Sequence, residues 1–316
     1  MNFVEQCLMR NPDDDYAVDD YKKSVPRWCA GCGDNGILAT VQRLCKEEQL
    51  TPEKTVFVSG IGCSSRFPHY MNTYGFHGLH GRALPVAEGV KVKRPDLNVF
   101  VVMGDGDCCS IGAQHWIHAI RYNMDMTVLM LDNQIYGLTK MQASPTTPHG
   151  LKSNTTPRGS YLEPLNPLTV TLGVSGVSFV AQAVDWAPDV LFDILSMAYR
   201  HKGLSFVRVL QRCPEFMPGH FDAWVHDADR IQLLDHEDGI QASESTRRIY
   251  TNRLVHDPID IHQAREIASS VDPIPVGVLY SNPDVVCYED SRRHTGAQTS
   301  AKTQAVLDHE FDRYSI

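Results

Sequence analysis

Long apolar runs are missing from this sequence. None of its 316 residues belongs to a stretch that approaches the roughly 18 consecutive apolar residues of a membrane-spanning helix. Residues 1–20 are acidic and contain no apolar core of the kind that a signal peptide carries. We therefore expect a cytoplasmic protein that does not enter a membrane.

An excess of positive charge is missing as well. The sequence has 29 Lys and Arg against 38 Asp and Glu, and the net charge of −9 argues against a nucleic-acid-binding surface. It also has no internal repeat. Its 42% of hydrophobic and 21% of charged residues are ordinary for a globular protein, and the length allows one or two domains with a large core.

Nine cysteines are present, and they do not suggest a disulfide framework. An odd number in a chain without an export signal indicates a metal or redox role for some and burial for the rest. Four stand out by position, because two form a Cys-x-x-Cys pair before a predicted helix and two directly follow predicted strands: Cys29, Cys32, Cys63 and Cys213. The others are interpreted as packing residues: Cys7, Cys45, Cys108, Cys109 and Cys287.

Several kinds of centre compete for these four thiols. Four cysteines suit an iron–sulfur cluster, but a structural zinc can use the same ligands. The string WCAGC looks like a thioredoxin redox pair at a helix start, although the basic, Pro-containing residues 21–27 are not the strand that such a pair needs. Simple burial of all four would leave their placement unexplained.

The chain from Met103 to Lys140 contains the strongest pattern. The apolar residues 98–103 end at a Gly-Asp-Gly-Asp string, a helix-length segment follows, and the apolar residues 127–131 end at Asp-Asn. This order predicts a strand, a helix and a second, parallel strand, with both polar clusters at the carboxyl edge where such sheets bind ligands. The helix is expected to bury an apolar face that contains Ile111, His115, Ile117, Ala119 and Ile120.

These polar clusters have the composition of a site for a metal-bound diphosphate. Asp105 offers a carboxylate, Asn133 an amide oxygen and Ile135 a carbonyl, which are the hard oxygen ligands that Mg²⁺ prefers. Gly104 and Gly106 let the backbone approach a phosphate, and the following helix points its amino end at the negative charge. The alternative is a pair of ordinary loops that bind nothing.

The rest of the chain continues the α/β pattern. Helices are expected at 33–50, from about 84 and at 188–201, and strands at 55–59, 177–181 and 205–210. In the first of these helices one face is apolar: Ile37, Leu38, Val41 and Leu44. Later parts are less regular, with a long polar connection, a charged segment that looks helical and a polar tail: 141–167, 222–270 and 285–316.

Four strings carry a resemblance to a known family, and they occur in the order WCAGCGDNGIL, GIGCSSRFPHYMNTYGFHGLHGRALPVAEG, GDGD and DNQIYGLTKMQASPTTP. Over about residues 20–220 the sequence resembles the β subunit of the 2-oxoacid:ferredoxin oxidoreductases, including the spacing of the four cysteines. The GDG and Asn133 segment resembles the thiamine-diphosphate motif, with Asp132 where an Asn is usual.

The resemblance implies an α/β fold, namely a parallel-sheet thiamine-diphosphate-binding domain with a C-terminal extension. We divide the chain into an N-terminal arm, a binding domain that includes the cluster ligands and the extension: 1–28, 29–220 and 221–316. The resemblance further implies that one 4Fe–4S cluster is held by Cys29, Cys32, Cys63 and Cys213. It also implies that Mg²⁺ is held by Asp105, Asn133 and Ile135. The cofactor is expected to contact Gly62, Cys63, Ser64, His80, Gly104, Asp105, Gly106, Asp107, Asn133, Ile135, Gly137, Leu138 and Thr139.

Three residues are candidates for catalysis by the same resemblance. Arg66 suits the substrate carboxylate because a planar guanidinium binds a carboxylate through two hydrogen bonds, with a surface arginine as the alternative. His80 is a candidate to donate to the diphosphate or to transfer a proton, with a structural hydrogen bond as the alternative. Lys140 is a candidate to line the substrate pocket.

The implied activity is the oxidative decarboxylation of a 2-oxoacid with coenzyme A, in which electrons pass from thiamine diphosphate through one cluster to ferredoxin. The wording of the strings looks most like the 2-oxoglutarate enzymes, which make succinyl-CoA and CO₂, with pyruvate or a broad 2-oxoacid range as the alternative. A different class is a non-catalytic, zinc-stapled subunit that binds a diphosphate.

Partners are implied by what the chain does not contain. A glutamate that activates thiamine normally comes from a second domain, so an α subunit is expected to supply it, in an (αβ)₂ heterotetramer. Ferredoxins are typically acidic, and a local basic patch is therefore expected to dock one. The candidate patch is Lys22, Lys23 and Arg27, with an ordinary solvated charge run as the alternative.

Overall fold

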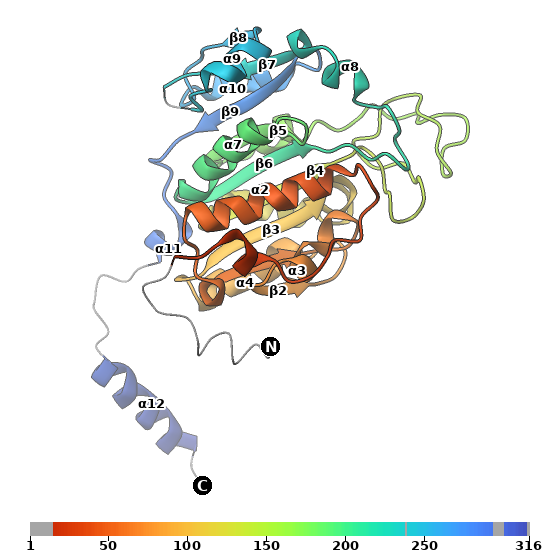
Figure 1. The fold of residues 1–316 in the computed structure, drawn as a ribbon. Helices are drawn as coiled ribbons and strands as arrows, with labels where there is room; N and C mark the ends of the chain where they lie inside the picture. The colour runs from red at the N-terminus through yellow and green to blue at the C-terminus, as the bar shows by residue number, and fades with distance from the viewer. Residues whose placement is uncertain (1–14, 238, 293–299, 315–316) are drawn as a thin grey trace.

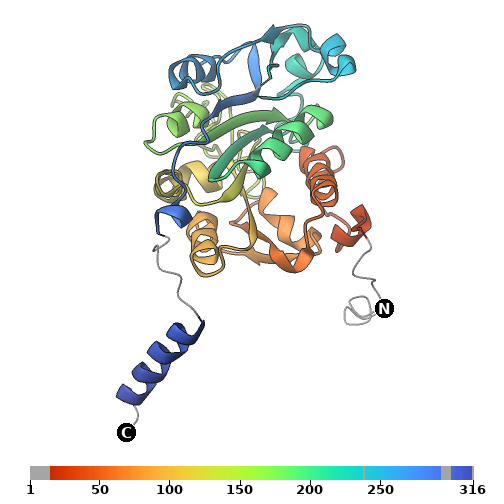
Figure 2. The ribbon, with the colours of Figure 1, turned by 90° about the vertical axis from the view of Figure 1, so that its left-hand side faces the viewer.

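The computed structural model describes residues 15–237, 239–292 and 300–314. Within them, nine strands form one sheet in the order β2-β1-β3-β4-β6-β5-β9-β7-β8. Helices cover both faces of this sheet (Figures 1 and 2). The strands are β1 Thr55–Ser59, β2 Tyr74–His77, β3 Asn98–Gly104, β4 Met126–Asp132, β5 Phe179–Val184, β6 Leu204–Leu210, β7 Ile231–Leu234, β8 Arg253–Leu254 and β9 Ile274–Ser281.

The α-helices are α2 Gly33–Glu47, α3 Phe67–Tyr70, α4 Ala83–Lys93, α5 Ala113–Tyr122, α6 Pro167–Leu172, α7 Pro188–Arg200, α8 Asp222–Val225, α9 Glu244–Ile249, α10 Ile261–Ala268, α11 Tyr288–Ser291 and α12 Ser300–Tyr314. Most of these helices lie between strands in the chain, whereas α2 precedes β1 and α11 and α12 follow β9. In Figures 1 and 2, α12 lies apart from the rest of the chain. None of the described helices is both long and apolar enough to cross a bilayer.

The register of the parallel strands places the functional loops. Gly104 of β3 pairs with Leu131 of β4, and Asp132 of β4 pairs with Leu210 of β6. Ser59, the last residue of β1, pairs with Val102 of β3. The segments that follow these four strands therefore leave the sheet at one edge, and the predicted α/β fold with a parallel sheet is confirmed.

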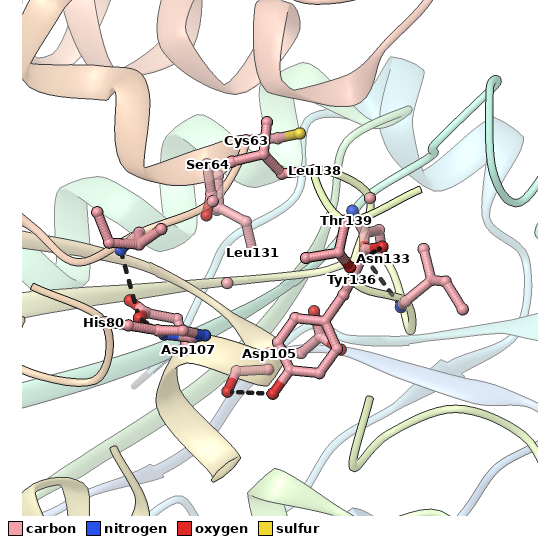
Figure 3. A pocket seen from close by; sticks show the side chains of 16 residues that line it. Cys63, Ser64, His80, Asp105, Asp107, Leu131, Asn133, Tyr136, Leu138 and Thr139 are labelled. Atoms are coloured by element: carbon pink, nitrogen blue, oxygen red, sulfur yellow. Dashed lines mark hydrogen bonds and ion pairs between the residues drawn. The ribbon is translucent and has the colours of Figure 1, made fainter. Parts of the chain in front are cut away.

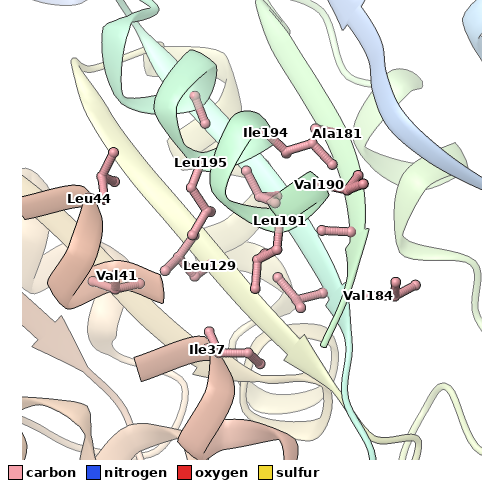
Figure 4. Packing of buried hydrophobic residues seen from close by; sticks show 14 of the residues in the cluster. Ile37, Val41, Leu44, Leu129, Ala181, Val184, Val190, Leu191, Ile194 and Leu195 are labelled. Atoms are coloured by element: carbon pink, nitrogen blue, oxygen red, sulfur yellow. The ribbon is translucent and has the colours of Figure 1, made fainter. Parts of the chain in front are cut away.

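The two faces of the sheet bury separate cores. On one face, α2 and α7 pack over β4, β5 and β6, with Ile37 and Val41 facing Leu191 and Leu195 in Figure 4. The predicted apolar face of α2 is confirmed, since its four residues are all buried. On the other face, α4 and α5 pack over β1 and β3, and Trp116 stacks on Phe206 with ring centroids 5.6 Å apart. Both faces of a parallel sheet need such cover.

The predicted apolar face of α5 is wrong in part. Ala119 and Ile120 are buried, but Ile111 and Ile117 are 52% and 39% exposed, and the buried aromatic residue is Trp116. The segment begins with a π-type turn, Asp107–Ile111, before α5 starts. A π turn takes an extra residue, which rotates everything after it relative to a continuous α-helical pattern.

The charge pattern of residues 222–270 predicts a helical segment, and this prediction is wrong. These residues contain α8, β7, α9, β8 and α10, and β7 lies beside β9, which pairs antiparallel with β5. The buried strand β7 is only four residues long, too short to show a period in the sequence. The C-terminal extension thus continues the same sheet.

Candidate functional site

A pocket opens at the carboxyl edge of the sheet, between the loops that follow β1, β2, β3 and β4 (Figure 3). Every residue predicted to contact the cofactor lies on its wall. The wall also includes three residues that the sequence did not indicate: Ile61, Leu131 and Tyr136. The structure therefore brings the predicted cofactor residues together, while their binding role stays a prediction.

The predicted metal ligands share this pocket. Asp105 is 3% exposed, and its Oδ2 accepts a hydrogen bond from Thr146 Oγ1 at 2.7 Å. Asn133 Oδ1 accepts one from Ile135 N at 3.1 Å, which folds the chain so that both residues reach the wall. Burial, with Asp132 nearby, raises the pKa of Asp105 to about 7. A set of hard oxygen donors with one buried carboxylate fits a magnesium ion.

Asp132, which stands where the motif usually has Asn, has its own partner. It is fully buried, and its Oδ2 accepts hydrogen bonds from Arg208 Nε at 2.7 Å and from an Arg208 terminal nitrogen at 2.6 Å. Thr146 Oγ1, which donates to Asp105, also lies 3.0 Å from Asp132 Oδ1, so this hydroxyl sits between the two carboxylates. Arg208 on the neighbouring strand β6 thus balances the additional carboxylate.

Sequence reasoning missed both Thr146 and Arg208. Arg208 is a charged residue inside the otherwise apolar strand 205–210, and a charge in a buried strand is a signal that could have marked it. Thr146 belongs to the long polar connection 141–167, and no local pattern distinguishes it from the neighbouring hydroxyl residues.

His80 is held against the pocket by Asp107. The ring nitrogen Nδ1 lies 2.5 Å from Asp107 Oδ1, and the ring meets Tyr136 edge-on with centroids 6.0 Å apart. Tyr136 in turn donates its hydroxyl to Gly106 O at 3.0 Å. A Cβ on Gly106 would lie 2.1 Å from the Tyr136 ring, so this position of the Gly-Asp-Gly loop has room only for glycine.

Hydrogen bonds connect the segments that carry the four predicted cluster cysteines. Trp28 Nε1 donates to Cys63 O at 2.7 Å, and Gly33 N donates to Arg212 O at 3.0 Å. These bonds join the Cys-x-x-Cys loop to the segments that hold Cys63 and Cys213. A Cβ on Gly137 would lie 3.7 Å from Cys63 Sγ and 4.0 Å from Cys213 Sγ, so both sulfurs border the pocket wall.

The thiols also interact electrostatically. Burial raises the pKa of Cys63 to about 11, with smaller contributions from Asp34, Cys213 and Cys29. Burial likewise raises the pKa of Cys32, and the charges of Cys63 and Cys213 raise it further. Within the described residues, no group of three or more His, Cys, Asp or Glu side chains is arranged closely enough to hold a metal ion. The donor set fits a metal–sulfur centre by number and type, since thiolates here need a positive partner.

The structure does not place Arg66 on the pocket wall. Arg66 ends a short 3₁₀ turn, Ser64–Arg66, that leads into α3, so its side chain points to Arg27 O at 3.4 Å and lies over the Tyr70 ring. Lys140 is exposed just beyond the wall, in a left-handed conformation with φ of 63°. Arg66 thus lies outside the wall of this pocket, and the roles of Arg66 and Lys140 both stay predictions.

The remaining cysteines bear out their interpretation as packing residues where the structure describes them. The side chains of Cys45, Cys108, Cys109 and Cys287 are all buried. Cys7 lies outside the described residues.

Comparison with known proteins agrees with this geometry. Residues 60–209 match the family "Thiamine pyrophosphate enzyme, C-terminal TPP binding domain", and residues 244–296 match the C-terminal region of the pyruvate ferredoxin oxidoreductase beta subunit. The chain is 39% identical over 279 residues to 2-oxoacid:ferredoxin oxidoreductase 1, subunit beta, of Aeropyrum pernix, a match that covers 86% of this chain and 83% of that one. The chain belongs to the β subunits of the 2-oxoacid:ferredoxin oxidoreductases.

Two further relatives are 2-oxoglutarate enzymes. The 2-oxoglutarate oxidoreductase subunit KorB of Mycobacterium tuberculosis is 50% identical over 197 residues, and the chain spans about half of that relative, with 62% of this chain and 52% of KorB covered. A structure of 2-oxoglutarate:ferredoxin oxidoreductase from Magnetococcus marinus, with 2-oxoglutarate, coenzyme A and succinyl-CoA bound, aligns with a TM-score of 0.77 at 35% identity, covering 93% of this chain and 96% of that one. The family predicted from the sequence is confirmed.

Proposed function

We propose that this β subunit acts with an α subunit as a 2-oxoglutarate:ferredoxin oxidoreductase, which converts 2-oxoglutarate and coenzyme A to succinyl-CoA and CO₂. One observation carries the proposal: the pocket with the metal-ligand set shares its wall residue Cys63 with the cysteine cluster. A site for a diphosphate cofactor and a site for an electron acceptor are thus adjacent. Similarity to KorB at 50% identity favours 2-oxoglutarate over pyruvate or a broad range.

Each part of the site has a role in this proposal. Asp105, Asn133 and the Ile135 carbonyl would hold Mg²⁺ and, through it, the diphosphate of thiamine diphosphate. When bound, thiamine diphosphate supplies the carbanion that attacks the keto carbon of the substrate. One 4Fe–4S cluster would be held by Cys29, Cys32, Cys63 and Cys213.

The surface around the pocket supports a covering α subunit. Leu79 and Leu138 are 72% and 58% exposed, and Ile111 and Phe76 are also at the surface. Ile111 packs against the Gly81 loop beside Leu79, and Leu138 lies on the pocket wall. Large apolar side chains that gather at the mouth of a site mark a protein interface. The α subunit would bury them and bring the glutamate that activates thiamine.

The main test uses the co-expressed αβ pair under anaerobic conditions. Reduction of a viologen dye with coenzyme A is measured across 2-oxoacids, and 2-oxoglutarate is expected to give the highest kcat/KM. A higher value for pyruvate would instead favour the alternative substrate. A colourless pair with stoichiometric zinc and no activity would favour the zinc-stapled subunit, and full turnover by this chain alone would exclude the obligate partner.

A basic surface beside the cysteines supports ferredoxin as the acceptor. Lys23 and Arg27 are exposed, and Arg27 N donates to Tyr70 OH at 3.0 Å, which fixes the arm next to Arg66 and His69. Lys22 is already paired with Asp19 at 2.8 Å. Lys23 and Arg27, with Arg66, are therefore the cations that can meet an acidic partner near Cys63.

Charge reversal at this surface should slow ferredoxin reduction selectively. The double variant Lys23→Glu/Arg27→Glu is expected to lower kcat/KM for ferredoxin about tenfold at low ionic strength and less at high salt, because steering by charge is screened. Viologen reduction should be unchanged. The control is Lys54→Glu, an exposed residue just before the amino end of β1. An equal loss in the control, or a loss that salt does not relieve, would refute the docking site.

A further inference from the structure

Asp107 joins three loops of the pocket through one oxygen. It is 2% exposed, and it lies just after β3, next to the Gly-Asp-Gly loop. Its Oδ1 accepts hydrogen bonds from Ile61 N at 3.3 Å, after β1, and from Gly81 N at 2.7 Å, in the loop between β2 and α4. The third partner is His80 Nδ1 at 2.5 Å. A buried carboxylate with this many donors is a built feature of the site.

The backbone of two glycines packs closely against Asp107. A Cβ on Gly60 would lie 1.9 Å from Asp107 Oδ2, and a Cβ on Gly112 would lie 2.4 Å from Asp107 O. The carboxylate therefore lies directly against the backbone of Gly60, and the main chain of Asp107 lies against Gly112. His80 is hydrogen-bonded to this buried carboxylate.

The contact decides which nitrogen of His80 is available to a ligand. A ring nitrogen that faces a carboxylate carries the proton, so Nδ1 is the donor to Asp107. The His80 side chain is 38% exposed and lies on the pocket wall, with its ring edge-on to Tyr136. Nε2 is left for the pocket. When Nε2 also carries a proton, the carboxylate stabilises the charged ring, which then donates to an anionic oxygen.

We infer that Asp107 is a positioning residue that holds His80 so that Nε2 donates to an anionic oxygen of the ligand in the pocket. The inference rests on the proposed function, because that function places an anionic ligand there. Two groups offer the required oxygen: the diphosphate of the cofactor and the carboxylate of the 2-oxoacid. Both are recognised by the same chemistry, and the measurements below separate them.

A double-mutant cycle on the αβ complex tests the inference. Asp107→Asn retains an oxygen at the Oδ1 position for the three donors but loses the charge, and His80→Asn removes the ring. Each single variant is expected to lose about tenfold or more, the size of a lost charge-assisted hydrogen bond, and the double variant should be no worse than His80→Asn alone. Additive losses would mean that Asp107 acts only through loop structure, and would overturn the inference.

The affected constant identifies the ligand group. A loss in thiamine-diphosphate affinity, measured by calorimetry with Mg²⁺ and without substrate, assigns His80 to the diphosphate. A rise in KM for the 2-oxoacid at unchanged cofactor affinity assigns it to the substrate carboxylate. The control Asp189→Asn removes a carboxylate that is 79% exposed at the start of α7, and it should change neither constant.

A third measurement does not depend on turnover. In the full-length chain labelled with ¹⁵N-histidine, the signal that disappears in His80→Asn reports the His80 ring. It is expected to show a protonated Nδ1, and Asp107→Leu, which removes the acceptor oxygen, should shift it toward the other tautomer. An unchanged signal would contradict the inference. If the wild-type complex oxidises no 2-oxoacid, the proposed function fails, whereas this measurement still decides the role of Asp107.

Discussion

Replacing Cys63 with alanine should remove the proposed iron–sulfur centre and lower viologen reduction by at least about 100-fold, the upper end of the effect of losing even an outer-shell partner of a metal site. Cys63 follows β1 directly, and its sulfur borders Gly137 together with that of Cys213. With one thiolate missing, the remaining three cannot complete four-cysteine ligation.

The fold and the diphosphate site should survive this substitution. Cys63 is only half-buried, and its main-chain carbonyl, which accepts from Trp28 Nε1, is retained in alanine. The proposed metal ligands Asp105 and Asn133 come from other loops. Iron and acid-labile sulfide content, the visible absorption of the anaerobic protein and thiamine-diphosphate affinity are the measurements, and only the last should be unchanged.

Cys45 provides the matched control. It is fully buried within the core between α2 and the sheet, and we interpret it as a packing residue. Cys45→Ala should keep its iron, its colour and its activity per folded molecule, although it can lose stability. If Cys63→Ala kept its full iron content, or if both variants lost it, the assignment of the four ligands would be wrong.

The second large effect concerns stability. Arg208→Gln should lower the free energy of unfolding by about 3–5 kcal/mol, because it leaves the Asp132 carboxylate buried without its cation. The Asp132 side chain is fully buried and that of Arg208 is 12% exposed, so water can compensate little of the loss. Arg208 also donates to Gln182 Oε1 at 3.1 Å, and this bond is weakened too.

A second substitution should restore most of this stability. In Asp132→Asn/Arg208→Gln two neutral amides replace the ion pair, and the residue at 132 becomes the Asn that is usual in the thiamine-diphosphate motif. Asp132→Asn alone leaves the Arg208 charge unpaired and should also destabilise. The difference between the double variant and the sum of the single variants measures their coupling.

Urea unfolding of the full-length chain without Mg²⁺ measures these changes as shifts of the transition midpoint. The control Arg94→Gln breaks an ion pair with Asp96 in which both side chains are about half exposed, and it should not shift the midpoint measurably. If Arg208→Gln were as stable as the control, Arg208 would not be the partner that makes Asp132 tolerable at this position.

Much of the candidate site could be predicted because its residues belong to short sequence motifs that directly follow predicted strands. The Gly-Asp-Gly loop and Asn133 each follow an apolar strand directly, so their place at one sheet edge follows from the parallel order alone. Cys63 and Cys213 could be placed in the same way. The apolar face of α2 was also predictable, since it keeps the α-helical period throughout.

Other features depend on contacts between distant parts of the chain. Thr146 reaches Asp105 from a long connection without regular structure, and Arg208 meets Asp132 only because β6 lies beside β4 in the sheet. The direction of Arg66 is set by a single 3₁₀ turn, and the rotation of α5 by a single π turn. One residue more or less in a turn leaves no trace in a hydrophobic pattern, yet it moves every following side chain.

The amino-acid sequence by itself determined the family, the parallel α/β architecture and the residue types of both proposed cofactor sites, because these depend on composition and on spacing along the chain. Only the tertiary structure decided the partners: Arg208 for Asp132, Thr146 for Asp105, Asp107 for His80, and β9 beside β5. The physical reason is that a buried polar group must be paired, while the residue that pairs it is chosen by which strands and loops come to lie side by side.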